Sequence, residues 1–98
     1  MLDYQEIARE RLSPTTTTGF TSTNIPPTKA QTIYVRIQSI GGDIFFRTDG
    51  EDATTATGNK LPENSVVEIH GSKAITNFRC IDCGDAAQVE CKYMGHGG

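Results

Sequence analysis

Three cysteines and one histidine near the C-terminus are the residues whose types and spacing best match a chemical site. Cys80-Ile-Asp-Cys83-Gly84 has the C-x-x-C-G form, in which backbone amides of a tight turn can support two metal-bound thiolates. Cys91 and His96 could complete a tetrahedral Cys3His set. A small binding module stabilised by zinc is therefore one alternative interpretation of the chain.

Other features of the same residues favour plain thiols or a disulfide over zinc. Cys80 and Cys91 fall in runs that alternate like strands, where cysteine behaves as a small buried hydrophobe. His96 lies between glycines in a tail with nothing to hold it. If Cys80 and Cys91 face each other across a hairpin, they could form a disulfide, and Cys83 would then be the candidate for a bond to another chain. We predict no metal ion and no cofactor, and the pairing of the cysteines stays open.

The sequence predicts no enzyme. A cysteine nucleophile needs a positioned base, and neither His70 nor His96 belongs to a recognisable motif. The chain also lacks the G-x-S-x-G, G-x-x-x-x-G-K-[ST] and H-E-x-x-H patterns. Its carboxylates fall in turns or alternate on the solvent faces of predicted strands.

The elements that must position these residues are organised around the stretch from Thr32 to Thr48. Its first half alternates apolar and polar residues with the period of a strand that has one buried face, and the apolar positions are Ile33, Val35 and Ile37. Gly41-Gly42 tolerates the positive φ that a tight hairpin turn needs. Ile44 and Phe46 then share one face of the returning run. We expect an antiparallel hairpin here.

Three further runs complete the predicted β-domain, and they are Ser65–His70, Ala74–Ile81 and Ala87–Tyr93. In the last run, the inward positions are Ala87, Val89, Cys91 and Tyr93. Closely spaced strands with glycine-rich turns indicate an all-β fold, either a small antiparallel β-sandwich or a barrel. We place this domain at residues 31–94, followed by a flexible tail over residues 95–98.

The first 30 residues have a different character. Spacing predicts a short helix over residues 1–13, with Tyr4, Ile7 and Leu12 on one face. Threonines and prolines make residues 14–30 an extended arm that lacks the composition for a core of its own. The arm is either a flexible linker or a strap laid along neighbouring subunits, with Phe20 and Ile25 as its anchors. The predicted assembly contacts are Tyr4, Ile7, Leu12, Phe20 and Ile25.

Composition limits the classes of partner. The formal net charge is −3, with three acids and three bases in residues 1–29 and nine acids and six bases in residues 30–98, so no basic patch predicts nucleic-acid binding. No apolar run approaches the ~18 residues of a membrane span, and we expect neither a membrane segment nor a secretion signal. A domain of about seventy residues is marginal alone, which favours help from neighbouring subunits.

The loop from Thr48 to Asn59 is rich in threonine and acidic residues. Asp49, Glu51 and Asp52 do not match the spacing of a calcium-binding EF-hand, so we predict a solvated acidic loop. A third interpretation is a receptor- or carbohydrate-binding β-sandwich to which Tyr34 and this loop contribute.

The order of these motifs resembles small virion proteins of tailed bacteriophages. The resemblance runs over residues 31–93 and rests on Val35-Arg-Ile-Gln38, Gly42-Asp-Ile-Phe-Phe-Arg-Thr-Asp-Gly50, Thr54-Thr55, Gly58, Leu61, Ile75-Thr-Asn-Phe-Arg79 and Ala87-Gln-Val-Glu-Cys-Lys-Tyr93. What is similar is a succession of short strands around an Arg-x-Asp-Gly turn, a threonine-rich loop and a final strand ending in tyrosine. The cysteines are not typical of this group.

The resemblance implies a non-enzymatic structural subunit, made in the host cytoplasm and present in many copies on the virion. It would decorate or cement the capsid, or belong to the head–tail neck or collar. Its implied partners are capsid, portal or neck subunits and copies of itself. An intermolecular disulfide through the odd cysteine would strengthen such an assembly.

Overall fold

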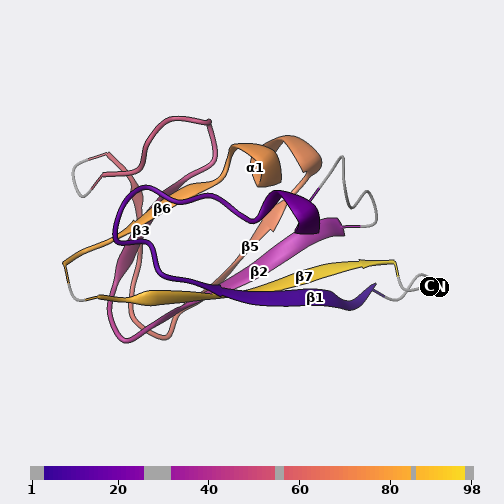
Figure 1. Ribbon diagram of the computed structural model, residues 1–98, viewed down its shortest axis with the longest axis horizontal. Helices are drawn as coiled ribbons and strands as arrows, with labels where there is room; N and C mark the ends of the chain where they lie inside the picture. The colour runs from indigo at the N-terminus through magenta and orange to yellow at the C-terminus, as the bar shows by residue number, and fades with distance from the viewer. Residues whose placement is uncertain (1–3, 26–31, 55–56, 85, 97–98) are drawn as a thin grey trace.

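The computed structural model describes residues 4–25, 32–54, 57–84 and 86–96. Within these ranges the chain forms seven strands, one short α-helix and one turn of 3-10 helix (Figure 1). They are β1 (Tyr4–Leu12), η1 (Ser22–Asn24), β2 (Thr32–Ile40), β3 (Ile44–Arg47), β4 (Asn59–Leu61), β5 (Val66–His70), α1 (Ser72–Asn77), β6 (Arg79–Asp82) and β7 (Gln88–His96).

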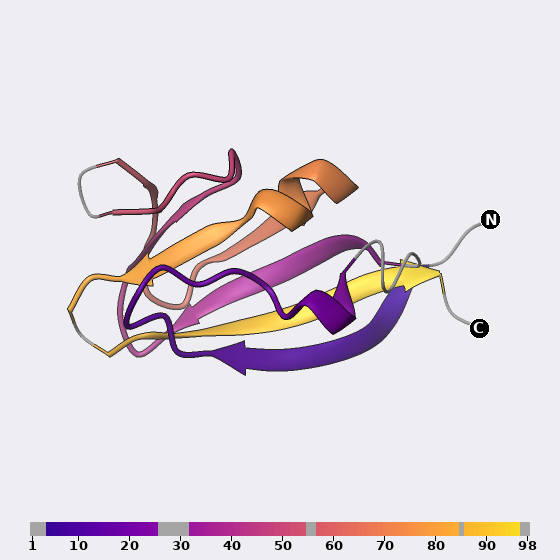
Figure 2. The same cartoon turned by 45° about the horizontal axis from the view of Figure 1, so that its top comes forward.

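The strands form two antiparallel sheets. The larger sheet has the strand order β1-β7-β2-β5, and the smaller sheet has the order β4-β3-β6. In Figure 2 the long strands β1, β7 and β2 lie side by side, with β3, β6 and α1 on one side of them. The prediction of an all-β antiparallel fold is confirmed.

One hydrophobic core joins the two sheets. The larger sheet contributes Val35, Ile37, Val89, Cys91 and Tyr93, and the smaller sheet contributes Ile44, Leu61 and Cys80. The predicted inward face of the last strand is confirmed, since Ala87, Val89, Cys91 and Tyr93 are all buried. Alternation along a strand therefore identified this part of the core correctly.

Gly41-Gly42 carries the chain from one sheet to the other, so the predicted hairpin is wrong. β2 pairs with β5 and β7, whereas β3 pairs with β4 and β6. Gly41 has φ +80°, a left-handed conformation that favours glycine. The apolar run around this turn thus supplies both sides of the core, with Ile37 on one side and Ile44 on the other.

The predicted N-terminal helix over residues 1–13 is wrong where the structure describes the chain. Residues 4–12 form β1, which pairs antiparallel with β7. The inner face of β1 carries Ala8, Glu10 and Leu12, which lie opposite Tyr93, Cys91 and Val89. A register shift between Glu6 and Ala8 then places Glu6 on the outer face together with Arg9. Residues 1–3 lie outside the described part.

Residues 13–25, which we call the crossing segment, pack on the chain's own core. Thr18 and Cys80 exchange two backbone hydrogen bonds of 2.9 and 2.8 Å, and Phe20 stacks on Phe78 with ring centroids 4.2 Å apart. Ile25 is also buried in the core. The described part of the predicted arm therefore belongs to the β-domain, and residues 26–30 of that arm lie outside the description.

The run Ala74–Ile81, predicted as one strand, is divided. Its first half lies in α1, and only from Arg79 does the chain enter β6. A helical turn places residues three apart on one side, which allows Ile75 and Phe78 both to be fully buried. A continuous strand would send these two side chains to opposite faces.

The Arg-x-Asp-Gly turn after β3 makes hydrogen bonds within itself and to the end of α1. The Arg47 guanidinium donates to the Asp49 carboxylate, which also accepts the backbone N–H of Glu51 at 3.1 Å. Gly50 has φ +86° and donates its N–H to the carbonyl of Asn77 at 3.1 Å. The turn therefore fastens the end of β3 to the end of α1.

Candidate functional site

The outer face of the larger sheet carries exposed ion pairs at both of its edges. On β1, Arg9 pairs with Glu6 at 2.8 Å, and Arg11 pairs with Glu90 of β7 at 2.8 Å. At the other edge, Arg36 of β2 pairs with Glu68 of β5 at 2.9 Å. Exposed ion pairs of this kind add little to the free energy of folding. They do define the positions of positive and negative charge on this face.

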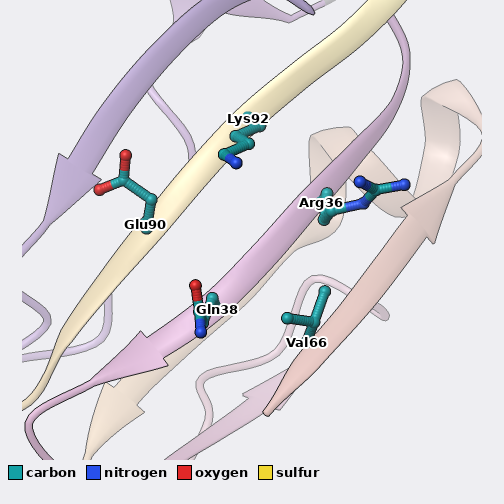
Figure 3. A pocket seen from close by; sticks show the side chains of 5 residues that line it. All are labelled: Arg36, Gln38, Val66, Glu90 and Lys92. Atoms are coloured by element: carbon teal, nitrogen blue, oxygen red, sulfur yellow. The ribbon is translucent and has the colours of Figure 1, made fainter. Parts of the chain in front are cut away.

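Between these edges lies a hollow of about 260 Å³. Figure 3 shows its lining, which is Arg36 and Gln38 of β2, Val66 of β5, and Glu90 and Lys92 of β7. Arg36 points toward β5 and Glu90 points toward β1. Val66 is 52% exposed and is the exposed large hydrophobic side chain among the described residues. The lining thus combines one apolar side chain with charges of both signs.

A half-buried carboxylate stands on the inner side of the same sheet. Glu10 of β1 accepts hydrogen bonds from the Thr21 hydroxyl at 2.5 Å, the Thr21 N–H at 3.2 Å and the Asn24 amide at 3.3 Å. The hydroxyl of the fully buried Tyr93 donates to the same carboxylate. Glu10 thereby joins the crossing segment to β1 and β7.

Electrostatics keep this group charged. Burial raises the pKa of Glu10, but the hydrogen bonds from Thr21, Tyr93 and Asn24 together outweigh it and hold that pKa below its ordinary value of 4.5. Burial, and after it the hydrogen bond to Glu10, raise the pKa of the Tyr93 hydroxyl, which stays protonated as a donor. The arrangement is that of a structural clamp, since the oxygens of Glu10 are committed to the chain's own donors.

The structure separates the three cysteines. Cys80 lies in β6 of the smaller sheet and Cys91 in β7 of the larger one, so the predicted arrangement across a hairpin is wrong. Both are buried free thiols. Cys83 is half-exposed in the turn after β6. A bond from Cys83 to another chain remains a prediction.

The cysteine geometry does not support the zinc alternative. Burial raises the pKa of Cys80 to about 12, and burial also raises that of Cys91, so both sites disfavour the thiolate that zinc binds. Within the described residues, no three His, Cys, Asp or Glu side chains form a group that could hold a metal ion. The side chain of His96 lies outside the description.

The predicted assembly contacts belong to two parts of the fold. Phe20 and Ile25 of the crossing segment and Leu12 of β1 are buried in the chain's own core. Ile7 is partly buried against that core at the register shift of β1. Tyr4 pairs with His96 at the start of β1, and its side chain lies outside the description.

The residues of the carbohydrate-binding alternative belong to different sheets. Tyr34 stacks on His70 on the outer face of the larger sheet, with ring centroids 4.7 Å apart. The acidic threonine loop joins β3 to β4 in the smaller sheet, and its Ala53 donates its N–H to Thr17 at 3.2 Å.

Sequence reasoning missed Glu10, which the helical interpretation directed away from the apolar face. The alternation of Ala8, Glu10 and Leu12 is the signal that could have found it, because residues at period two share one face of a strand. It also missed that residues 4–12 form an edge strand of the larger sheet.

Comparison with protein-family models, with curated proteins and with solved structures finds no match for this chain. Among the described residues, no helix has the length and apolar character to cross a membrane.

Proposed function

We propose that the protein is a structural subunit of a tailed-phage virion, present in many copies and attached to the capsid or to the head–tail neck. It is made in the host cytoplasm and acts by contact with capsid, portal or neck subunits and with copies of itself. The resemblance of residues 31–93 to small phage virion proteins is the first support for this proposal.

The observation that carries the proposal is the division between the two faces of the larger sheet. The crossing segment closes the inner face by packing Phe20 and Ile25 into the core. The outer face holds the charged hollow with the exposed Val66. We therefore assign the contact role to the outer face and the sheet edges, and we assign the crossing segment to the stability of the domain.

The two sheets fit a small β-sandwich better than a closed barrel. Each strand pairing in the described residues stays within one sheet, and the sheets meet through side chains of a common core. A sandwich of this type offers flat faces and strand edges, which are surfaces suited to repeated protein–protein contact.

Purified particles provide the test. Quantitative mass spectrometry of gradient-purified virions should recover the protein at several or more copies per particle. Recovery only from the unassembled fraction of infected cells would contradict the proposal.

A rebinding assay assigns the surface. Recombinant protein carrying Val66→Asp in the hollow should be retained less well by particles that lack the subunit, because a buried carboxylate at a contact is costly. Thr23→Ala, at an exposed position of the crossing segment, is the matched control and should bind like the original protein.

A further inference from the structure

β1 is a nine-residue strand at the edge of the larger sheet. Within the described residues it pairs with β7 on one side, and Figures 1 and 2 both draw its other side open. The crossing segment reaches β1 through Glu10 on the inner face of the sheet. A long strand with an open edge is a template for pairing with another strand.

The register shift gives this edge an unusual charge pattern. In a regular strand, residues three apart point to opposite faces. In β1 the shift between Glu6 and Ala8 puts Glu6 and Arg9 on the same outer face, opposite Met94 and Lys92 of β7. One acid and one base thus lie symmetrically about the irregular Ile7-Ala8 step.

This symmetry is what a two-fold contact between identical strands requires. When two copies of β1 pair antiparallel about an axis between Ile7 and Ala8, Glu6 of each copy lies opposite Arg9 of the other. Gln5 and Glu10, which share the inner face, also lie opposite each other in this register. Outer residues therefore meet outer residues, and inner residues meet inner residues, along the paired strands.

Three nearby registers lack this complementarity. An axis through Arg9 places Arg9 of both copies opposite each other, and an axis through Glu10 places Arg9 opposite Arg11. Like charges directly opposite each other in a sheet are destabilising. An axis through Ala8 places the outer Glu6 opposite the inner Glu10, so the two faces do not match.

We propose that β1 pairs antiparallel with β1 of a second copy, about a two-fold axis between Ile7 and Ala8, so that two four-stranded sheets become one continuous sheet. The proposal rests on the proposed function in that it names one partner within the assembly. Main-chain hydrogen bonds along the edge supply the attraction, and the two Glu6–Arg9 contacts between copies select the register.

Charge reversal tests this register directly. Sedimentation of the full chain at low ionic strength should show a concentration-dependent dimer, since salt screens exposed pairs. Glu6→Arg places two arginine pairs across the axis, and Arg9→Glu places two glutamate pairs there. Each single variant should raise the dimer dissociation constant by about tenfold or more.

A mixture of the two variants is the sharper measurement. When the Glu6→Arg protein meets the Arg9→Glu protein, both contacts across the axis again join an acid to a base. The mixture should therefore form a heterodimer at concentrations where each variant alone is mostly monomeric. Restoration by mixing cannot come from the Glu6–Arg9 pair within one chain, because each variant chain has lost that pair.

Glu68→Arg is the matched control, because it removes an ion pair of similar exposure at the opposite edge of the same sheet. It should leave dimerisation unchanged, and circular dichroism should show that all three variants keep the β-fold. If Glu68→Arg alone abolishes the dimer, the contact lies at β5 and the proposal is overturned.

Two outcomes distinguish this inference from the proposed function. A wild-type chain that stays monomeric at all concentrations, with no heterodimer in the mixture, overturns the β1 contact even if the protein is recovered on particles. A dimer that responds to charge reversal as described, with no recovery on particles, upholds the β1 contact and contradicts the virion role.

Discussion

Glu10 is the residue that links the crossing segment to β1 and β7. Its carboxylate accepts hydrogen bonds from Thr21, Asn24 and Tyr93, which belong to the crossing segment and β7. Because these donors are committed to a half-buried acceptor, removing the charge leaves several of them with a poorer partner. The hydrogen bonds of Glu10 therefore stabilise the folded state.

Glu10→Gln should lower the free energy of unfolding at neutral pH by about 2 kcal/mol. The glutamine amide has only one acceptor oxygen, and its NH2 group would face the groups of the crossing segment and β7 that donate to Glu10. Urea titration followed by circular dichroism measures the change. Glu63→Gln, at an exposed position in the turn before β5, is the control and should leave stability nearly unchanged.

Acid should reveal the same clamp. Since the folded pKa of Glu10 lies below its ordinary value of 4.5, its stabilisation is fully present above about 4.5 and is lost as the pH falls through the lowered folded value. The wild type should therefore lose more stability than Glu10→Gln between neutral pH and pH 3. Equal losses in the two proteins would contradict a charged Glu10 in the fold.

The cysteines should differ sharply in reactivity. Cys80 and Cys91 are fully buried, and burial raises the pKa of both thiols, whereas Cys83 is half-exposed. A thiol reagent added to the native, reduced protein should modify Cys83 first and the other two only on unfolding. Peptide mapping after a brief reaction identifies the modified residue, and rapid modification of Cys91 would contradict the buried position of β7.

At the level of elements, β1 explains the main error of the sequence prediction. Its residues, Tyr-Gln-Glu-Ile-Ala-Arg-Glu-Arg-Leu, include several strong helix formers, and their spacing gave a plausible helical face. Pairing with β7 determines the outcome instead, since it satisfies the backbone of β7 and brings Leu12 into the core. Local propensity cannot report a partner that lies about eighty residues away in the sequence.

The same limit applies to β2 and β3. Alternation correctly identified Val35, Ile37 and Ile44 as buried, because burial depends on the period of a strand. It was wrong at the start of β2, where a register shift between Thr32 and Tyr34 leaves Ile33 partly buried and Tyr34 buried. It could not tell whether Gly41-Gly42 closes a hairpin or links two sheets, because a glycine pair serves either connection. The inner core was thus predictable from the sequence, and the pairing partners were not.

The crossing segment should prove essential to the isolated domain. Phe20→Ala removes a ring that stacks on Phe78 and meets Tyr93 edge-on, with ring centroids 5.6 Å apart in the second contact. The expected loss is about 3–5 kcal/mol of unfolding free energy, measured by urea titration of dilute protein. Thr23→Ala in the same segment should have little effect. Unchanged stability of Phe20→Ala would contradict packing of Phe20 within its own chain.

For the whole molecule, stability should be graded from the centre of the larger sheet outward. β7 has β1 on one side and β2 on the other, and its Val89, Cys91 and Tyr93 are fully buried. Amide hydrogen exchange should be slowest in β7 and β2 and faster in the three-residue edge strand β4. Exchange that is slowest in β4 would contradict this order.

The candidate surface was less predictable than the core. The sequence directed the assembly role to apolar anchors such as Phe20 and Ile25, because exposed apolar residues are the usual sign of a contact. In the fold, Phe20 and Ile25 are buried in the chain's own core. The outer face of the larger sheet carries paired charges instead. Which charged residues share a face depends on the register shift in β1, and the sequence alone contains no signal for that shift.

The chain enters and leaves the larger sheet at the same end, since Tyr4 of β1 pairs with His96 of β7. A short peptide joining these two points would close the polypeptide into a ring without disturbing any strand pair. Cutting that ring at Gly41-Gly42, next to Ile40 and its partner Gln88, would create new termini at the far end of the sheet. A peptide fused to a terminus would therefore sit at one end of the larger sheet in the original chain and at the opposite end in the circularly permuted chain.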